Sequence, residues 1–307
     1  MKDQADKLRE IIESLKKKQM KSNDSSIIYE NSREKATKSR IITITSGKGG
    51  VGKTNIAVNL SIALGTIGYR VALIDADLGL ANIDVMLGIS SKYSLVDILN
   101  DEIDIMETLS EGPRGIKFIS GGSGIEELVK LDKEQLEKFI NNIGILDNYF
   151  DIIIIDTGAG LSDNVLSFVM SSDEVIIVTT PDPTAITDAY ALIKIVSSRD
   201  MHKNVKIIVN RAETIREAND VLDKLVFVSD KFLKMKVLPL GIVLYDENVV
   251  KAVKMQQPFF ISNPNSIASK LIKDISMNLS NKNNYTKNLE ESGMRSFVKK
   301  LYSFFAG

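Results

Sequence analysis

Residues 47–54 combine two lysines, four glycines and a threonine in a spacing suited to holding phosphate. The pattern G-x-x-x-x-G-K-[ST] is matched by Gly47, Gly52, Lys53 and Thr54. Glycines allow successive backbone N–H groups to converge on phosphate oxygens. Lys53 would neutralise the β- and γ-phosphates, and Thr54 would offer its hydroxyl to Mg²⁺. We therefore predict that ATP and Mg²⁺ bind here, and the predicted nucleotide-binding residues of this segment are Gly47, Lys48, Gly49, Gly50, Val51, Gly52, Lys53, Thr54 and Asn55.

Two further apolar segments end in aspartates, whose oxygens suit the Mg²⁺ that accompanies ATP. Asp156 closes an isoleucine-rich run and precedes Gly158 and Gly160. This is the Walker B arrangement, so we expect Asp156 to orient water bound to Mg²⁺. Asp75 and Asp77 close another apolar run, and an acidic turn or helix cap is the alternative for both. The predicted metal site consists of Thr54, Asp77 and Asp156, while Asp75 is expected to support the loop.

The elements that must position these residues alternate between short strands and longer helices. The predicted strands, rich in Val and Ile, span residues 40–45, 70–74, 115–119, 151–155, 174–179, 205–210 and 236–242. The predicted helices span residues 53–66, 132–147, 161–170, 184–198, 214–234, 246–254 and 265–279. Continuously apolar strands separated by helices predict an α/β fold with a doubly wound, mostly parallel sheet flanked by helices.

The chain divides into five predicted segments. Residues 40–280 form the predicted P-loop ATPase domain. An amphipathic helix over residues 1–20 and a polar linker over residues 21–39 precede it. A second polar linker over residues 281–291 and a last amphipathic helix over residues 292–307 follow it.

Composition narrows the chemistry and the partners. The chain has no cysteine and a single histidine, His202. Disulfides, cysteine-ligated zinc and thiol catalysis are therefore excluded, and a histidine triad is disfavoured. Neither a signal-type apolar stretch near the N-terminus nor a run of 18 apolar residues is found in the sequence. The net charge is +3 over residues 1–39, −7 over residues 40–280 and +3 over residues 281–307. Because residues 40–280 carry a net negative charge, we do not expect this segment to bind DNA phosphates.

The phosphate loop contains a lysine that a simple phosphate cradle does not need. With Lys48 the loop resembles the K-G-G-x-G-K-[ST] pattern of the MinD/ParA-type deviant Walker A ATPases. The resemblance implies an ATP-bound homodimer in which Lys48 reaches the partner's phosphates, and Asp77 as the residue that positions or deprotonates water. It also implies that Asn210 reads adenine and that Asp182 and Tyr245 border the base and ribose. The predicted catalytic residues are Lys48, Lys53 and Asp77. A surface lysine is the alternative for Lys48, a strand-end turn is the alternative for Asn210, and residues 244–246 depart from the family's Pro-Glu-Asp.

The N-terminal segment narrows the resemblance to a flagellar branch of this family. Its element D-Q-A-x-x-L-R, typical of FlhG-type (FleN or YlxH) proteins, is matched by Asp3, Gln4, Ala5, Leu8 and Arg9. In that branch the element engages an FlhF-type GTPase. One apolar face of the predicted helix consists of Leu8, Ile11, Ile12 and Leu15. Packing of this face back onto the protein's own body is the alternative to partner binding.

The C-terminal segment has the composition of an in-plane membrane helix. Large apolar residues occupy one arc of the predicted helix, opposite a basic face with Lys299 and Lys300. The predicted membrane-contacting residues are Phe297, Val298, Leu301, Phe304 and Phe305. One such tail would bind weakly and two on a dimer would gain avidity, which predicts ATP-controlled attachment. Docking of the same face in a groove of its own domain is the alternative, and both states could alternate.

The resemblance implies a membrane-cycling ATPase that regulates flagellar number or placement. Its expected location is the cytoplasm and the inner face of the cell membrane, and flagellar switch-complex proteins are further expected partners. One alternative is a MinD-type ATPase that positions cell division. That type usually begins at the first strand, whereas 39 residues precede it here. A nucleotide-gated scaffold that needs no turnover is another alternative.

Overall fold

The computed structural model divides the chain into two units, Met1–Thr37 and Lys38–Gly307. It describes residues 38–77, 82–99, 103–121, 131–281 and 292–306. The predicted GTPase-binding element with Asp3 and Leu8 therefore lies outside the described residues.

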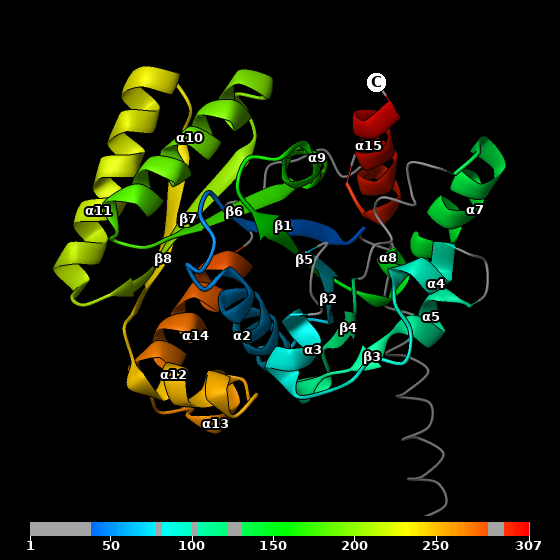
Figure 1. The fold of residues 1–307 in the computed structure, drawn as a ribbon, viewed down its shortest axis with the longest axis horizontal. Coiled ribbons are helices and arrows are strands. Elements are labelled where there is room, and N and C mark those ends of the chain that lie inside the picture. The colour runs from blue at the N-terminus through cyan, green and yellow to red at the C-terminus, as the bar shows by residue number, and fades with distance from the viewer. Residues whose placement is uncertain (1–37, 78–81, 100–102, 122–130, 282–291, 307) are drawn as a thin grey trace, which may run out of the picture. The chain divides into compact units, whose positions relative to one another are not determined.

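The second unit is built around one eight-stranded sheet (Figure 1). Its strands are β1 (Arg40–Ser46), β2 (Val71–Ala76), β3 (Ser110–Glu111), β4 (Lys117–Ile119), β5 (Ile152–Ala159), β6 (Glu174–Thr179), β7 (Asn204–Ala212) and β8 (Val237–Leu244). They lie in the order β3-β4-β2-β5-β1-β6-β7-β8, and only the β3–β4 pair is antiparallel. The prediction of a doubly wound, mostly parallel α/β sheet is confirmed.

Both faces of the sheet are covered by helices (Figure 1). The helices of the described residues are α2 (Lys53–Thr66), α3 (Asn82–Leu87), α4 (Leu95–Leu99), α5 (Ile105–Thr108), α7 (Lys133–Ile143), α8 (Leu146–Tyr149), α9 (Asp163–Ser171), α10 (Pro183–Arg199), α11 (Ile215–Val228), α12 (Glu247–Lys254), α13 (Phe259–Ser262), α14 (Ile267–Ser280) and α15 (Met294–Ala306). A 3₁₀ turn covers Pro113–Gly115 and a π turn covers Ser229–Leu233.

Alternation along the strands explains this layering. Ile42 and Ile44 of β1 belong to one buried cluster with residues of α2, α3, α12, α13 and α14. Ile41, on the opposite face, belongs to a cluster with residues of α7, α8, α9 and α15. Helices α10 and α11 cover the same face over β6 and β7. Successive side chains of a strand point to opposite faces, so a strand buried on both faces must be apolar throughout.

The predicted elements agree with the observed ones, with a few differences at short or irregular segments. Each predicted strand overlaps an observed strand, whereas β3 was not predicted. The helix predicted over residues 132–147 is interrupted at Gly144 and Ile145, which separate α7 from α8. Helices α3, α4, α5 and α13 have four to six residues each, too few for a helical period to be recognised.

The C-terminal helix α15 packs on the domain itself, against α7 and α9. Phe297, Val298 and Leu301 are each at most 3% exposed. The Phe297 ring lies 6.1 Å from that of Phe168 in α9. Phe304 and Phe305 are half-buried. The structure therefore shows the docked alternative, in which most of the predicted membrane-contacting face is covered. None of the helices in the described ranges is both long and apolar enough to cross a membrane.

Candidate functional site

The phosphate loop lies at the carboxyl end of β1, where the chain enters α2. Strand β1 has β5 on one side and β6 on the other, so loops from both halves of the sheet meet there. Gly52 has φ +91° and precedes the first residue of α2. A Cβ on Gly47 would overlap the backbone carbonyl of Asp188 in α10. Glycine is required at both positions, at Gly52 by the left-handed backbone and at Gly47 by the close approach of α10.

Beneath the loop, Lys53 forms a buried ion pair with Asp156 of β5. The Lys53 Nζ lies 2.7 Å from Asp156 Oδ1, and the two side chains are 7% and 0% exposed. Burial raises the pKa of Asp156, opposed by the Lys53 ammonium and a hydrogen bond with Thr54. Asp156 Oδ2 is buried and has no hydrogen-bond partner among the described residues. A buried carboxylate oxygen left free beside a phosphate loop fits a cation or its bound water.

Asp75 of β2 lies opposite Asp156 in the β2–β5 register. Burial, and then the negative charge of Asp156, raise the pKa of Asp75 to about 7. Asp75 accepts hydrogen bonds from the backbone N–H groups of Asp77 and Ile83, at 3.1 and 3.2 Å. It therefore holds both ends of the segment that carries Asp77, as predicted for a residue that supports this loop.

The predicted metal residues gather at one cavity of about 380 Å³. Thr54 and Asp77 line this cavity with Lys53, and Thr54 is hydrogen-bonded to Asp156 below. Asn82 donates a hydrogen bond of 3.1 Å to Asp77. No group of three or more His, Cys, Asp or Glu that could hold a metal occurs in the described part of the chain. The donor set instead fits Mg²⁺ that takes most of its ligands from phosphate and water.

A second cavity, of about 410 Å³, adjoins the first. Its walls are largely apolar, from Ile56, Val243, Val249, Val250, Val253 and Phe259, with the polar side chains of Asn55, Asn210 and Tyr245 among its lining. This composition suits a planar base with a few hydrogen-bonding groups. Asn210 Nδ2 donates a hydrogen bond of 2.8 Å to the Val51 carbonyl, and Tyr245 is 58% exposed. The two cavities share Gly52 and Asn55, so base and phosphates would lie in one continuous groove.

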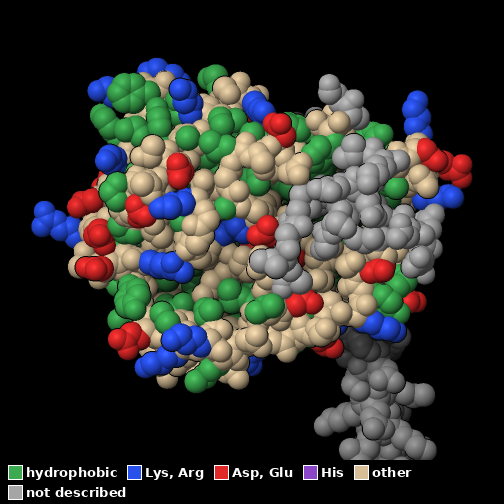
Figure 2. Space-filling model, viewed as in Figure 1, with side chains coloured by type: hydrophobic (Ala, Val, Ile, Leu, Met, Phe, Trp, Pro, Cys, Tyr) green, Lys and Arg blue, Asp and Glu red, His purple; other side chains and the backbone are tan. Residues whose placement is uncertain are grey.

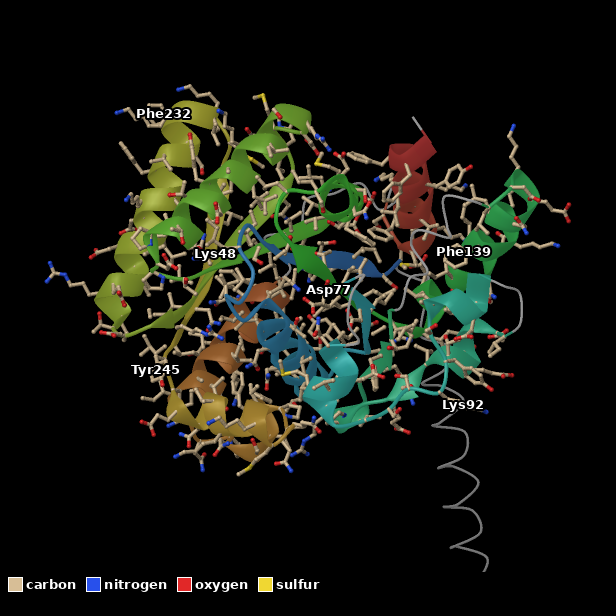
Figure 3. The ribbon with its side chains drawn as sticks, in the orientation of Figure 1. Lys48, Asp77, Lys92, Phe139, Phe232 and Tyr245 are labelled. Atoms are coloured by element: carbon tan, nitrogen blue, oxygen red, sulfur yellow. The ribbon has the colours of Figure 1, made fainter. Side chains whose placement is uncertain are left out.

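Lys48, labelled in Figure 3, does not line either of these two cavities. Its Nζ donates 2.8 Å to Asp182 Oδ2 and also bonds Thr184 at the start of α10. Lys48 and Asp182 line a third cavity instead, whose walls include Glu213 and Glu217. The Lys48 ammonium holds the pKa of Asp182 down at about 2. Contact of Asp182 with the nucleotide stays a prediction, since its present partners are Lys48 and Thr184.

Arg211 is a residue of the site that the sequence did not single out. It lines all three cavities, and its Nη1 donates 2.8 Å to the Gly50 carbonyl. The available signal was its position directly after Asn210. In a regular strand, however, the side chain of Arg211 would point to the face of the sheet opposite to that of Asn210, so its place in the groove could not be expected from the sequence.

Comparisons with known proteins agree with this geometry. The ParA family model, described as NUBPL iron-transfer P-loop NTPase, matches residues 37–280. The chain is 39% identical over 236 residues to the antiactivator FleN of Pseudomonas aeruginosa, covering 77% of this chain and 84% of FleN. It is 35% identical over 269 residues to the flagellum site-determining protein YlxH of Helicobacter pylori, covering 86% of this chain and 90% of that protein.

Two solved structures extend the comparison to three dimensions. A chain of the MinC:MinD cell division protein complex of Aquifex aeolicus matches with a TM-score of 0.65 and 28% identity, covering 81% of this chain and 99% of that one. The septum site-determining protein MinD complexed with Mg-ADP, from Pyrococcus horikoshii, matches with a TM-score of 0.63 and 25% identity, covering 79% and 96%. The matched family segment contains every cavity described above and ends before α15.

Proposed function

Because this chain belongs to the MinD/ParA family of P-loop ATPases, we propose that it hydrolyses ATP with Mg²⁺ and cycles between a monomer and an ATP-bound dimer. The observation that carries this proposal is the buried Lys53–Asp156 pair, with a free Asp156 oxygen below an open phosphate loop. The Mg-ADP bound to the similar MinD of Pyrococcus horikoshii supports the choice of ligand.

The described residues divide the work of hydrolysis between binding and activation. Thr54 and Asp156 would hold Mg²⁺, which when bound neutralises charge on the β- and γ-phosphates. Lys53 would turn from Asp156 toward the phosphate oxygens. Asp77 lines the same cavity and would orient the attacking water. Lys48 lies outside its own phosphate cavity, which fits a role at the phosphates of the partner subunit.

We infer that the biological role is regulation of flagellar number or placement. Similarity to the antiactivator FleN and to the flagellum site-determining protein YlxH supports this role. The FlhF-type GTPase would be engaged by the element that includes Asp3, Gln4, Ala5, Leu8 and Arg9. Flagellar switch-complex proteins are further proposed partners. Over the described residues, Figure 2 shows Lys and Arg interspersed with Asp and Glu on the viewed face, which gives no support to a DNA-binding role there.

Positioning of cell division is the second candidate, favoured by the similarity to MinD structures. The N-terminal segment discriminates between the two roles. Deleting residues 1–20 should abolish stimulation of an FlhF-type GTPase in the flagellar role and change nothing in the division role.

Membrane cycling is proposed through release of α15. Phe297, Val298 and Leu301 are covered in the docked state, so membrane contact requires α15 to leave α7 and α9. A dimer would carry two such helices, whose combined binding exceeds that of one. The protein would then move between the cytoplasm and the inner face of the cell membrane as ATP binds and is hydrolysed.

Vesicle sedimentation tests this cycle directly. The full chain and a chain ending at residue 291 are mixed with anionic phospholipid vesicles, with Mg-ATP or Mg-ADP. We expect only the full chain with ATP to sediment strongly, and Lys48→Ala to sediment no more with ATP than with ADP. Equal sedimentation of the shortened chain would contradict the role of α15, and nucleotide-independent sedimentation would contradict the cycle.

A further inference from the structure

The end of β7 contains a bulge at which two consecutive side chains point the same way. Its register against β8 shifts between Asn210 and Ala212. Arg211, between them, has φ +59°, in the left-handed region. Bulges of this kind bend the strand and re-aim a side chain, often beside active sites.

The re-aimed side chains both reach the phosphate loop. Asn210 Nδ2 donates 2.8 Å to the carbonyl of Val51, and Arg211 Nη1 donates 2.8 Å to the carbonyl of Gly50. Two neighbouring residues of β7 thus hold two neighbouring peptides of the loop. In a trans peptide the C=O and N–H point in opposite directions. These contacts therefore turn the N–H groups of Val51 and Gly52 away from β7.

The backbone of Arg211 is left-handed at the point where its side chain contacts the phosphate loop. A left-handed conformation is uncommon for arginine and persists where the surroundings determine it. The Arg211 side chain is exposed and forms no salt bridge within the described ranges. Its recorded hydrogen bond is the one to Gly50, and it lines the base, phosphate and Lys48 cavities at once. The bulge therefore serves both the nucleotide groove, which Asn210 and Arg211 reach, and the core, in which Ala212 is buried.

We propose that Arg211 is a positioning residue for the nucleotide. It clamps the Gly50 peptide so that the loop N–H groups are oriented before the nucleotide arrives, and it places a cation where the two parts of the groove meet. Its ligand class is a nucleoside di- or triphosphate, so the inference rests on the proposed function. Because the clamp pre-orients the loop and acts alike on the bound ground state and on the transition state, its loss should weaken binding and leave turnover at saturation nearly unchanged.

The test compares Arg211→Ala, Arg211→Gly and Arg211→Lys with the unmodified protein. ADP affinity is measured by calorimetric titration, kcat and KM by phosphate release, and Tm by thermal unfolding. We expect the Kd for ADP and the KM for ATP to rise roughly tenfold or more in Ala and Gly, as for loss of a charged hydrogen bond. Lysine should restore part of this loss, and kcat should stay within about threefold.

Glycine separates positioning from structural support. It adopts a left-handed backbone without strain, so Arg211→Gly should keep or raise the Tm while it weakens binding. Arg216→Ala, which removes an exposed arginine of α11, is the matched control and should change neither quantity. Unchanged affinity in Ala and Gly would overturn the inference. The inference would also be overturned if Arg211→Gly lost affinity only together with a lowered Tm, or if kcat fell while KM stayed unchanged. Failure of the unmodified protein to bind ADP would instead refute the proposed function.

Discussion

The two ends of the sheet bury carboxylates in opposite ways. At the amino end, Glu174 of β6 is fully buried between two cations. One of its oxygens accepts a hydrogen bond of 2.9 Å from Arg40 Nε, and the other accepts a hydrogen bond from Lys206 Nζ. At the carboxyl end, Asp156 and Asp75 are equally buried, yet among the described residues they share a single cation partner, Lys53, which bonds one oxygen of Asp156.

The difference separates a structural network from a binding site. A buried carboxylate with both oxygens bonded to cations has no capacity left for a ligand, so it fixes neighbouring strands together. Two adjacent buried carboxylates with one unpartnered oxygen are destabilising by themselves, and such arrangements persist where a ligand completes them. The amino end joins β1, β6 and β7, whereas the carboxyl end keeps one buried carboxylate oxygen without a hydrogen-bond partner in the described residues.

The largest expected effects are a loss of ATP hydrolysis at the carboxyl end of the sheet and a loss of stability at its amino end. Lys53→Ala should lower steady-state ATP hydrolysis by about 100-fold or more, because the phosphates lose their buried cation. Asp156 can take up a proton, so stability should change less. Glu174→Ala removes the buried carboxylate that bonds both Arg40 and Lys206, and should lower the free energy of unfolding by about 3 kcal/mol while folded protein still hydrolyses ATP.

Phosphate release and urea unfolding of both variants measure these losses. Normal hydrolysis by Lys53→Ala would contradict its assignment to the site. Loss of hydrolysis in Glu174→Ala without loss of stability would place the amino end in the functional machinery and remove the contrast.

A smaller effect follows from the pH dependence of stability at the carboxyl end. The folded-state pKa of Asp75 is raised from 3.8 to about 7. Between these values the folded protein binds a proton that the unfolded chain has lost. The contribution of Asp75 therefore makes the free energy of unfolding fall with rising pH in that window, by roughly 1.4 kcal/mol per pH unit, and stay level above it.

Asp75→Asn should remove this contribution while an amide oxygen still accepts from the loop backbone. The free energy of unfolding is measured with urea at pH 5, 6, 7 and 8. From pH 5 to pH 7 the unmodified protein should lose stability relative to the Asp75→Asn variant, and above pH 7 the difference between the two proteins should stay constant. Parallel curves for the two proteins would show that Asp75 is ionised throughout the range.

The sequence was sufficient for the parts of the site that are local. Apolar runs before Asp75 and Asp156 predicted the strands that carry them, and glycine spacing predicted the phosphate loop. The pairing of Asp75 with Asp156 was beyond reach, because it depends on β2 lying beside β5 in a particular register. The direction of Arg211 depends on a bulge, and no glycine, the usual residue at a left-handed bulge position, marks that bulge in the sequence.

The C-terminal helix shows the same limit for amphipathic patterns. The apolar face that includes Phe297 and Leu301 suits both a membrane and a protein groove. The groove is formed by Phe139 and Ile143 of α7 with Phe168 of α9, which are distant in the chain. Only the folded domain reveals that such a surface is available, so periodicity could not choose between the alternatives.

The smallest expected effect concerns the exposed pair at the rim of the site. Lys48 and Asp182 have side chains 39% and 47% exposed, so their contact should add nothing measurable to the Tm. It does hold Lys48 beside α10, and its loss would free Lys48 to reach the partner's phosphates in the proposed dimer. Asp182→Asn should therefore raise steady-state hydrolysis by roughly two- to fivefold at subunit concentrations that allow dimers, the range expected for loss of an exposed ion pair.

The measurement is phosphate release as a function of protein concentration, with ATP affinity determined in parallel. Asp220→Asn, at an exposed position of α11, is the matched control for loss of one surface charge. A raised rate with unchanged affinity would show that Asp182 restrains Lys48. A weakened affinity would instead support contact between Asp182 and the nucleotide. If both the rate and the affinity stayed unchanged, the Lys48–Asp182 pair would contribute to neither hydrolysis nor stability, and Asp182 would not restrain Lys48.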